Sequence, residues 1–140
     1  MTPSLKKIAS LAALFFSVSA VNAQDAKTVW DGVYTEEQAS RGEAVYTQAC
    51  IACHGQDLGG NSNSPALTGM SFMFLWEGRS LGEFYETIRS EMPTDRPGQL
   101  PEQDYLDVVA YILQKNAFPS SSDALPLSSE ALDKIDIVSE

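Results

Sequence analysis

The feature that most constrains this chain is the five-residue run Cys50-Ile51-Ala52-Cys53-His54. It contains both cysteines and the only histidine of the sequence. Two thiols at this spacing, followed at once by an imidazole, suit four kinds of site: a redox dithiol, a structural disulfide, part of a zinc site, or the attachment point of a c-type haem. The rest of the sequence has to be compatible with one of them.

Three of these interpretations find little support. A thioredoxin-like dithiol requires a βαβ pattern, which the sequence does not show. A disulfide between residues 50 and 53 would close so short a loop that it adds little stability. A zinc site would have two thiolates and one imidazole, and would need a carboxylate or water as its fourth ligand.

Covalent haem explains the spacing best. The two thiols add to the two vinyl groups on one haem edge, and the histidine that follows reaches the iron on one face. The motif therefore favours one haem c, bound covalently through Cys50 and Cys53, with His54 as an axial ligand of the iron.

The N-terminus has the composition of an export signal. Lys6 and Lys7 precede an apolar stretch over residues 8–21, and Val21-Asn22-Ala23 supplies small residues for cleavage. A membrane span needs roughly 18–20 apolar residues, so this stretch is too short for one, although an uncleaved anchor is the alternative. We expect a signal peptide over residues 1–23, a periplasmic protein, and no stable membrane insertion after cleavage.

The charge limits the possible partners. The chain has 19 acidic and 9 basic side chains, a formal charge of −10, and removing Lys6 and Lys7 with the signal leaves −12. Such an excess of acid argues against nucleic acid and anionic membrane surfaces, which attract Lys and Arg. A hydrophobic content of 44% predicts one folded domain rather than disorder.

The hydrophobic periodicity predicts an all-α domain with long loops around its cofactor. Nothing indicates a strand. We expect an N-terminal extension over residues 24–34, extended in conformation, a domain over 35–118, and a packed tail over 119–140 with a frayed end. Residues 55–79 are predicted to be irregular. The expected helices run from Thr35 to Ala49, from Ser80 to Ser90, from Pro101 to Lys115 before a stop at Asn116, and, as a short one, over 129–135.

Gly42 lies in the middle of the first expected helix. A glycine there costs about 1 kcal/mol relative to alanine. Close approach of another helix is the usual compensation, so we expect a helix crossing at Gly42; a glycine that is merely tolerated is the alternative.

The segment before the second long helix is too apolar for a bare surface loop. Its large apolar residues face either a haem or ordinary protein core; they are Leu67, Phe72, Phe74, Leu75 and Trp76.

Three methionines follow the signal: Met70, Met73 and Met92. Met92 is the preferred second axial ligand, because a whole helix between it and His54 lets the chain reach the opposite haem face. Pro93 restricts the backbone beside it. The alternatives are a gap-filling core methionine and an open iron position.

These motifs resemble class I cytochrome c over about residues 35–116. The resemblance rests on the Cys50–His54 motif, on Met92-Pro93, and on Asp107-Val108-Val109-Ala110-Tyr111. It implies that the first and last helices cross through Gly42 and Tyr46 on one side and Val108 and Tyr111 on the other. It also implies that Pro65, in Pro65-Ala66-Leu67-Thr68-Gly69, offers its carbonyl to the His54 ring.

A narrower resemblance concerns Val29-Trp30-Asp31-Gly32-Val33-Tyr34-Thr35, Arg41-Gly42, Trp76-Glu77-Gly78-Arg79 and Asn116-Ala117-Phe118-Pro119. These segments are similar to cytochromes c associated with pyrroloquinoline-quinone dehydrogenases. The resemblance implies such a dehydrogenase as electron donor and a terminal oxidase or another cytochrome as acceptor. Trp76 and Arg79 are candidates for binding a haem propionate; a core Trp and a solvated Arg are the alternatives. One departure is Leu100, where a capping Ser or Thr is common.

The expected function is therefore single-electron transfer rather than catalysis. The iron would cycle between Fe(III) and Fe(II) while both axial ligands stay in place. A small haem enzyme or ligand sensor with an open iron position is the alternative, as is a detached cytochrome subunit of a dehydrogenase complex.

Overall fold

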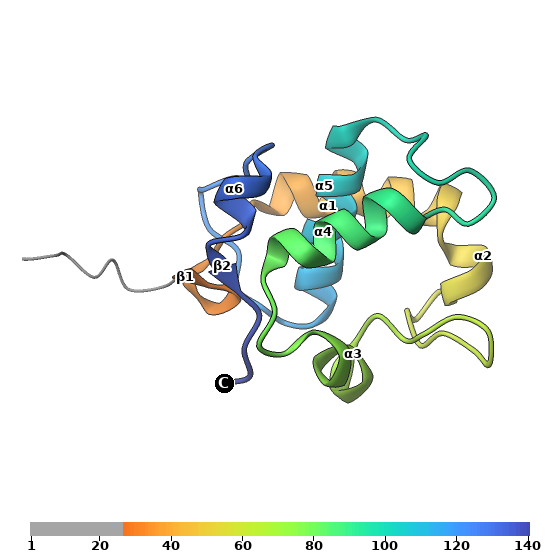
Figure 1. The fold of residues 1–140 in the computed structure, drawn as a ribbon, viewed down its shortest axis with the longest axis horizontal. Coiled ribbons are helices and arrows are strands. Elements are labelled where there is room, and N and C mark those ends of the chain that lie inside the picture. Colours follow the sequence, from red (N-terminus) through yellow and green to blue (C-terminus); the bar gives the residue numbers. More distant parts are fainter. Residues whose placement is uncertain (1–26) are drawn as a thin grey trace, which may run out of the picture.

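The computed structural model describes residues 27–140, so the predicted signal peptide lies outside the described residues. Helices dominate, as Figure 1 shows, and the all-α prediction is confirmed. In chain order the elements are β1 (Lys27–Thr28), a 3-10 helix (Val29–Asp31), α1 (Glu36–Ala49), α2 (Ile51–His54), α3 (Gly69–Trp76), α4 (Leu81–Glu91), α5 (Glu102–Lys115), α6 (Ser129–Leu132) and β2 (Ile135–Asp136).

Two helices begin at the predicted capping boxes. At the start of α1 the Thr35 hydroxyl accepts a hydrogen bond from the Gln38 N–H, and the Gln38 side chain accepts one from the Thr35 N–H. Ser80 and Glu83 pair in the same way at the start of α4. Such reciprocal bonds satisfy backbone donors that the first helical turn leaves free.

The last long helix begins one residue later than predicted. Pro101 is its N-cap and Glu102 its first residue, and no side chain caps it. It ends before Asn116, where the stop was predicted.

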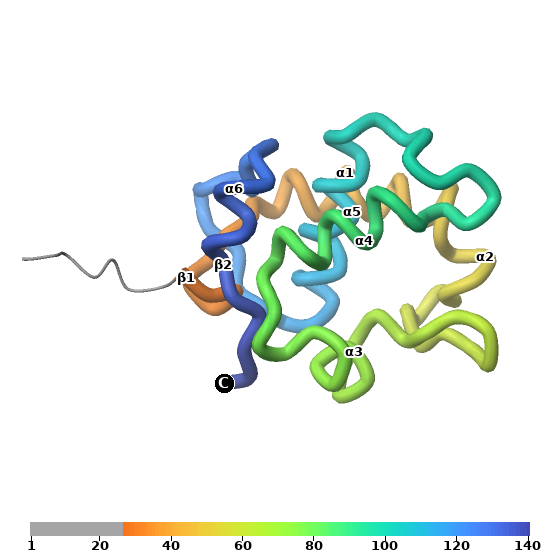
Figure 2. Tube along the Cα trace, in the orientation of Figure 1, coloured from red at the N-terminus to blue at the C-terminus, as the bar shows by residue number. Residues whose placement is uncertain are grey.

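α1 and α5 cross in close contact at Gly42. Figure 2 shows the two helices passing each other near the centre of the trace. A Cβ atom at Gly42 would overlap the Asp107 carbonyl and lie 2.9 Å from the Tyr111 Cβ. The predicted crossing and the predicted partner Tyr111 are confirmed. The backbone of Asp107, rather than Val108, makes the nearest contact.

An ion pair between the buried Asp107 carboxylate and the half-exposed Arg41 side chain lies at the same crossing. The Asp107 side chain is 2% exposed. It accepts hydrogen bonds from Arg41 Nε at 2.6 Å and Arg41 Nη2 at 2.9 Å, and a third from Gln103 Nε2 at 2.8 Å. These bonds raise the pKa of Arg41. A carboxylate at this depth is stable only because its oxygens are paired, so the ion pair strengthens the specificity of the crossing.

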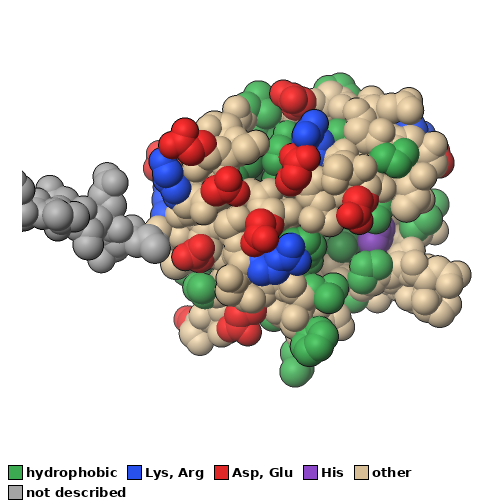
Figure 3. Space-filling view, viewed as in Figure 1, with side chains coloured by type: hydrophobic (Ala, Val, Ile, Leu, Met, Phe, Trp, Pro, Cys, Tyr) green, Lys and Arg blue, Asp and Glu red, His purple; other side chains and the backbone are tan. Residues whose placement is uncertain are grey.

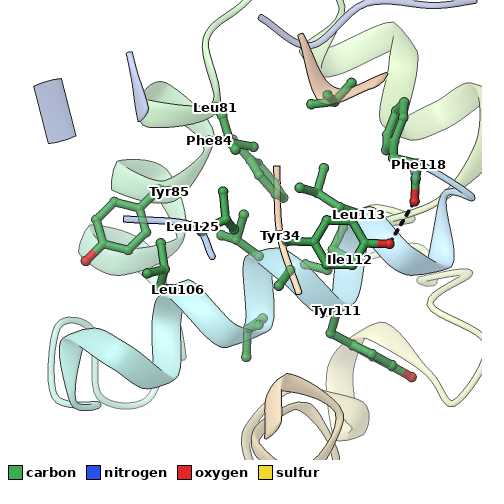
Figure 4. Packing of buried hydrophobic residues seen from close by; sticks show 14 of the residues in the cluster. Tyr34, Leu81, Phe84, Tyr85, Leu106, Tyr111, Ile112, Leu113, Phe118 and Leu125 are labelled. Carbon is green, nitrogen blue, oxygen red and sulfur yellow. Dashed lines mark hydrogen bonds between the residues drawn. The ribbon is translucent and has the colours of Figure 1, made fainter. Parts of the chain in front are cut away.

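The core lies between α4, α5 and the segments at either end of the chain. Figure 4 shows Leu81, Phe84 and Tyr85 of α4 facing Leu106, Ile112 and Leu113 of α5, with Tyr34, Phe118 and Leu125 around them. The Tyr34 hydroxyl donates to the Phe118 carbonyl at 2.7 Å. The two terminal segments therefore complete the core and do not merely cover it.

Both terminal segments differ from their predicted conformation. Residues 29–31 form a 3-10 helix rather than an extended strand of chain, and Val29 and Val33 are buried. The tail forms the predicted short helix, but its end is tied down: β2 pairs with β1 in parallel, and the Trp30 Nε1–H donates to the Val138 carbonyl at 2.9 Å. Two-residue strands are too short to show an alternating pattern, which is why they could not be predicted.

The segment over residues 55–79 is not wholly irregular, because it contains α3. The prediction missed this helix since its eight residues carry no charge and so no contrast between polar and apolar faces. Phe72 and Trp76, one turn apart, are both buried. Their rings pack against Phe84 at centroid distances of 5.3 Å and 4.6 Å.

The crossing yields a direct test. Gly42→Val places a branched side chain against the Asp107 backbone, which cannot move without shifting α5. Overpacking of this kind costs about 1–3 kcal/mol, and we expect the upper end of that range in thermal or urea unfolding. Ala44→Val, on the exposed side of α1, is the matched control and should cost about 0.5 kcal/mol. Equal losses in the two variants would contradict the crossing.

Candidate functional site

The Cys50–His54 motif forms a tight turn at the end of α1. The Cys50 N–H still donates to the Tyr46 carbonyl at 2.9 Å, and the His54 N–H donates to the Cys50 carbonyl at 3.0 Å. Residues three and four apart in a helical turn lie on one side of it. The backbone therefore brings Cys50, Cys53 and His54 together, with both cysteines as free thiols.

The two thiols have different surroundings. Cys50 is half-buried and Cys53 is exposed. Burial raises the pKa of Cys50 to about 11, against the opposing effect of the nearby Arg96 cation. Arg96 belongs to the loop between α4 and α5, so the charge of this loop acts on the motif.

His54 is held in one orientation. The residue is 7% exposed, and its Nδ1 lies 2.9 Å from the Pro65 carbonyl oxygen. A carbonyl can only accept, so the ring proton lies on Nδ1 and the Nε2 lone pair is left for a ligand bond. The contact expected between Pro65 and His54 is present. Figure 3 shows the single histidine (purple) set back from the surface, with apolar side chains (green) around it.

The loop that carries Pro65 is fixed from its start. The Gly60 N–H donates to the His54 carbonyl at 2.9 Å, and the Asn61 amide donates to the Cys53 carbonyl at 2.8 Å. Leu58 is fully buried, and its carbonyl accepts from the Leu67 N–H at 2.8 Å. These bonds fold the loop back onto the motif.

Asn116 fixes the other end of this loop, a role that the sequence did not reveal. Its amide donates to the Leu67 and Ile112 carbonyls at 2.9 Å each, and its Oδ1 accepts from the Gly69 N–H at 2.9 Å. The sequence marked Asn116 only as a helix stop, because bonds to residues almost fifty positions away leave no local pattern.

Met92 lies at the end of α4 and is half-buried. Its carbonyl accepts from the Tyr105 hydroxyl at 2.8 Å, and Pro93 beside it is buried. The backbone of Met92 is thus anchored to α5. Of the other methionines, Met70 is 91% exposed and Met73 is partly buried against the core.

Trp76 and Arg79 lie together, as two residues that bind one group should. The Arg79 guanidinium carbon stands 4.4 Å from the centroid of the Trp76 ring. Arg79 Nε also lies 3.5 Å from the Glu83 carboxylate, in a pair with both side chains substantially exposed. A pair this exposed adds little stability, which leaves Arg79 free to exchange partners.

The five residues predicted to form one apolar wall are divided by α3. Phe72 and Trp76 point into the core, and Leu67 is partly buried against it. Phe74 and Leu75 are instead 89% and 45% exposed. The prediction treated the segment as a loop, in which all five could face one way, whereas a helix turns neighbouring side chains in different directions.

The residues present fit a covalently bound haem. Two free thiols and a buried imidazole share one helical turn, and the imidazole keeps Nε2 for a metal bond. Among residues 27–140, no group of three or more His, Cys, Asp or Glu side chains is placed to hold a metal ion. In the same range no helix is long and apolar enough to cross a membrane.

Comparisons with known proteins agree with this chemistry. Residues 37–112 match the family model of the cbb3-type cytochrome c oxidase subunit III. Over 53 residues the chain is 42% identical to cytochrome c-551 of Bacillus subtilis (strain 168), a match that covers 38% of this chain and 46% of that protein. The chain thus spans less than half the length of this curated relative.

One solved structure has a similar fold. The chain resembles a chain in the crystal structure of the sulfane dehydrogenase SoxCD from Paracoccus pantotrophus, with a TM-score of 0.51 and 20% identity. The superposition covers 90% of this chain and 66% of that one.

The role of Asn116 can be tested by Asn116→Ala. The change removes three hydrogen bonds and leaves the Leu67 carbonyl without its amide partner, so we expect a loss of about 1–3 kcal/mol in urea unfolding. Asn63→Ala, at an exposed asparagine of the same loop region, should change stability by less than about 0.5 kcal/mol. An unchanged midpoint for Asn116→Ala would show that the loop is held by other contacts.

Proposed function

Since this chain belongs to the cytochrome c family described by the cbb3-type oxidase subunit III, as the match over residues 37–112 shows, we propose that it is a periplasmic carrier of single electrons with one haem. The fold is the all-α cytochrome c fold, and the chain is a haem electron-transfer protein with covalently bound haem c. The single haem, its ligands, the location and the partners are the proposed part.

One observation carries the proposal: the His54 ring lies in the same turn as both thiols, with Nδ1 bonded to the Pro65 carbonyl at 2.9 Å. When bound, haem supplies an iron that gains or loses one electron. Cys50 and Cys53 would hold the group, and His54 Nε2 would bind the iron. The Pro65 carbonyl would hold a proton on Nδ1 and so leave Nε2 for the metal, and its hydrogen bond would increase the electron donation of the ring.

We propose that Met92 would be the second protein ligand of the iron. Tyr105 anchors the Met92 backbone, and Arg96 in the loop that follows is near enough for its charge to act on Cys50. A thioether ligand raises the reduction potential and suits electron transfer. Trp76 and Arg79, stacked at 4.4 Å, would bind a propionate, which would compete with Glu83 for the guanidinium.

The location and the partners rest on the sequence. The export signal predicted over residues 1–23 supports the periplasm. Segments similar to cytochromes of pyrroloquinoline-quinone dehydrogenases support such a dehydrogenase as donor, with a terminal oxidase or another cytochrome as acceptor. Several residues of these segments are structural: Trp30 packs edge-on against Phe118, and Val29 and Tyr34 are buried.

Met92→Ala tests the carrier against an enzyme or sensor with an open iron. We expect this variant to lose the weak near-infrared band of sulfur-to-iron charge transfer and to bind cyanide readily. Met73→Ala, which changes a partly buried methionine of α3, should keep the band and serves as the matched control. Retention of the band in Met92→Ala would disprove the assignment, and cyanide binding by the unaltered protein as fast as by the variant would favour an open iron.

Stopped-flow mixing tests the proposed donor. A pyrroloquinoline-quinone dehydrogenase supplied with its substrate should reduce the oxidised protein, because the donor then has electrons to pass on. Omission of the substrate is the control and should leave the protein oxidised. No reduction by the dehydrogenase at any ionic strength would exclude this donor, and the general role as an electron carrier would remain.

A further inference from the structure

We propose that the outer face of α3 is the docking surface for a redox partner protein whose own docking face is apolar. This inference rests on the proposed function and names the surface that serves it. The α3 face consists of Met70, Phe74 and Leu75, which are 91%, 89% and 45% exposed. Met70 and Phe74 lie one helical turn apart and so stand side by side.

The exposed apolar area of this face is large for a protein surface that binds nothing. Three such side chains together expose on the order of 400 Å² of apolar surface, within the range of the largest patch on a typical monomer, which is often functional. Figure 3 shows apolar side chains projecting from the α3 end of the molecule. They border a hollow of about 450 Å³ whose other lining residues are Pro65, Ala66 and Ser71.

The hollow shares one residue, Pro65, with the surroundings of the proposed iron ligand. Pro65, at its edge, is the residue whose carbonyl bonds His54 Nδ1 at 2.9 Å. A partner seated on Met70 and Phe74 would therefore contact the residue that touches the imidazole. Only Pro65 would then lie between the partner and His54. This position favours the α3 face over other exposed apolar residues as a docking surface.

The charge pattern identifies the chemistry of the partner. No charged residue occurs from Leu58 to Trp76, the longest uncharged run in a sequence with a formal charge of −10. A basic partner would find no carboxylate on the α3 face to pair with. A partner with an apolar face would bury Met70 and Phe74 without removing any charge from water.

The area of the face points to a transient encounter rather than to a second copy of this chain. A stable protein interface buries about 800 Å² on each partner, roughly twice what the α3 face offers. Interfaces of redox encounters are smaller than this, and an electron carrier has to leave its partner after each transfer.

The double variant Met70→Ser/Phe74→Ser tests the surface. The probes are two purified copper proteins of known structure, one with an apolar and one with a basic docking face, together with a small ruthenium ammine complex. We expect the double variant to react about tenfold more slowly with the apolar copper protein. Its reaction with the ruthenium complex should stay within about twofold of the unaltered protein, since a small complex needs no docking surface.

Two controls sharpen the result. Leu127→Ser changes an exposed leucine of the tail, 57% exposed and far along the chain from α3, and should leave all rates unchanged. The unaltered protein should react with the apolar copper protein at a rate that is nearly independent of salt up to about 1 M. A preference for the basic copper protein, with a rate that falls with salt, would overturn the proposal.

Three further outcomes would also overturn it. One is an equal rate of the double variant and the unaltered protein with the apolar partner. The second is a stable dimer of the unaltered protein, seen by sedimentation and lost in the variant, because the occupant would then be a second copy. The third is an altered haem spectrum in the variant, which would mean that these side chains face the haem. Failure of the proposed function would look different: even the ruthenium complex would not reduce the unaltered protein.

Discussion

The close approach of α1 and α5 at Gly42 determines where the functional residues lie. α1 runs directly into the Cys50–His54 turn, and α5 ends at Asn116, which bonds the segment after Pro65. The imidazole and the carbonyl that orients it are thus attached to opposite partners of one helix pair. Any side chain at residue 42 would push the two helices apart and with them the two halves of the His54–Pro65 contact.

The ion pair at the crossing adds what apolar packing alone lacks. Helix surfaces of similar shape can slide by one turn at little cost, whereas a buried carboxylate with three donors can be satisfied in only one register. Arg41 is the residue before Gly42, and Asp107 supplies the carbonyl nearest to it. The short distance between α1 and α5 and the register of their packing are therefore set by neighbouring residues, without a contribution from the cofactor.

Much of the structure could be predicted from local signals. The pairs Thr35/Gln38 and Ser80/Glu83 predict helix starts because a capping box joins residues three apart in the sequence. Gly42 predicts a helix crossing because a glycine lowers the stability of an isolated helix and needs a tertiary reason. α3 and the two short strands escaped prediction because their patterns are too short or lack polar contrast. Phe72 is buried and Phe74 exposed because α3 turns them in different directions, and this helix was not expected. The contacts of Asn116 could not be predicted because they join residues that only the tertiary fold brings together. The Cys50–His54 turn could be predicted because the spacing of its thiols and imidazole is set by the attachment of haem and not by packing.

The arrangement of α3 explains how an apolar face can be exposed and still be well defined. Phe72 and Trp76 hold the helix to Phe84 from the inside. The two ends are tied as well: the Gly69 N–H donates to Asn116, and the Gly78 N–H, just beyond the helix, donates to the Ile137 carbonyl at 2.8 Å. Met70 and Phe74 thus project from a helix that is fixed along its inner side and at both ends. A surface ordered in this way loses little conformational entropy when a partner binds, so even a small apolar area can give a useful encounter and still release the partner quickly. The C-terminal tail supplies Ile137 and lies far from the haem motif in the sequence. Its bond to Gly78 holds α3 in a fixed position, as the crossing of α1 and α5 does for the Cys50–His54 turn.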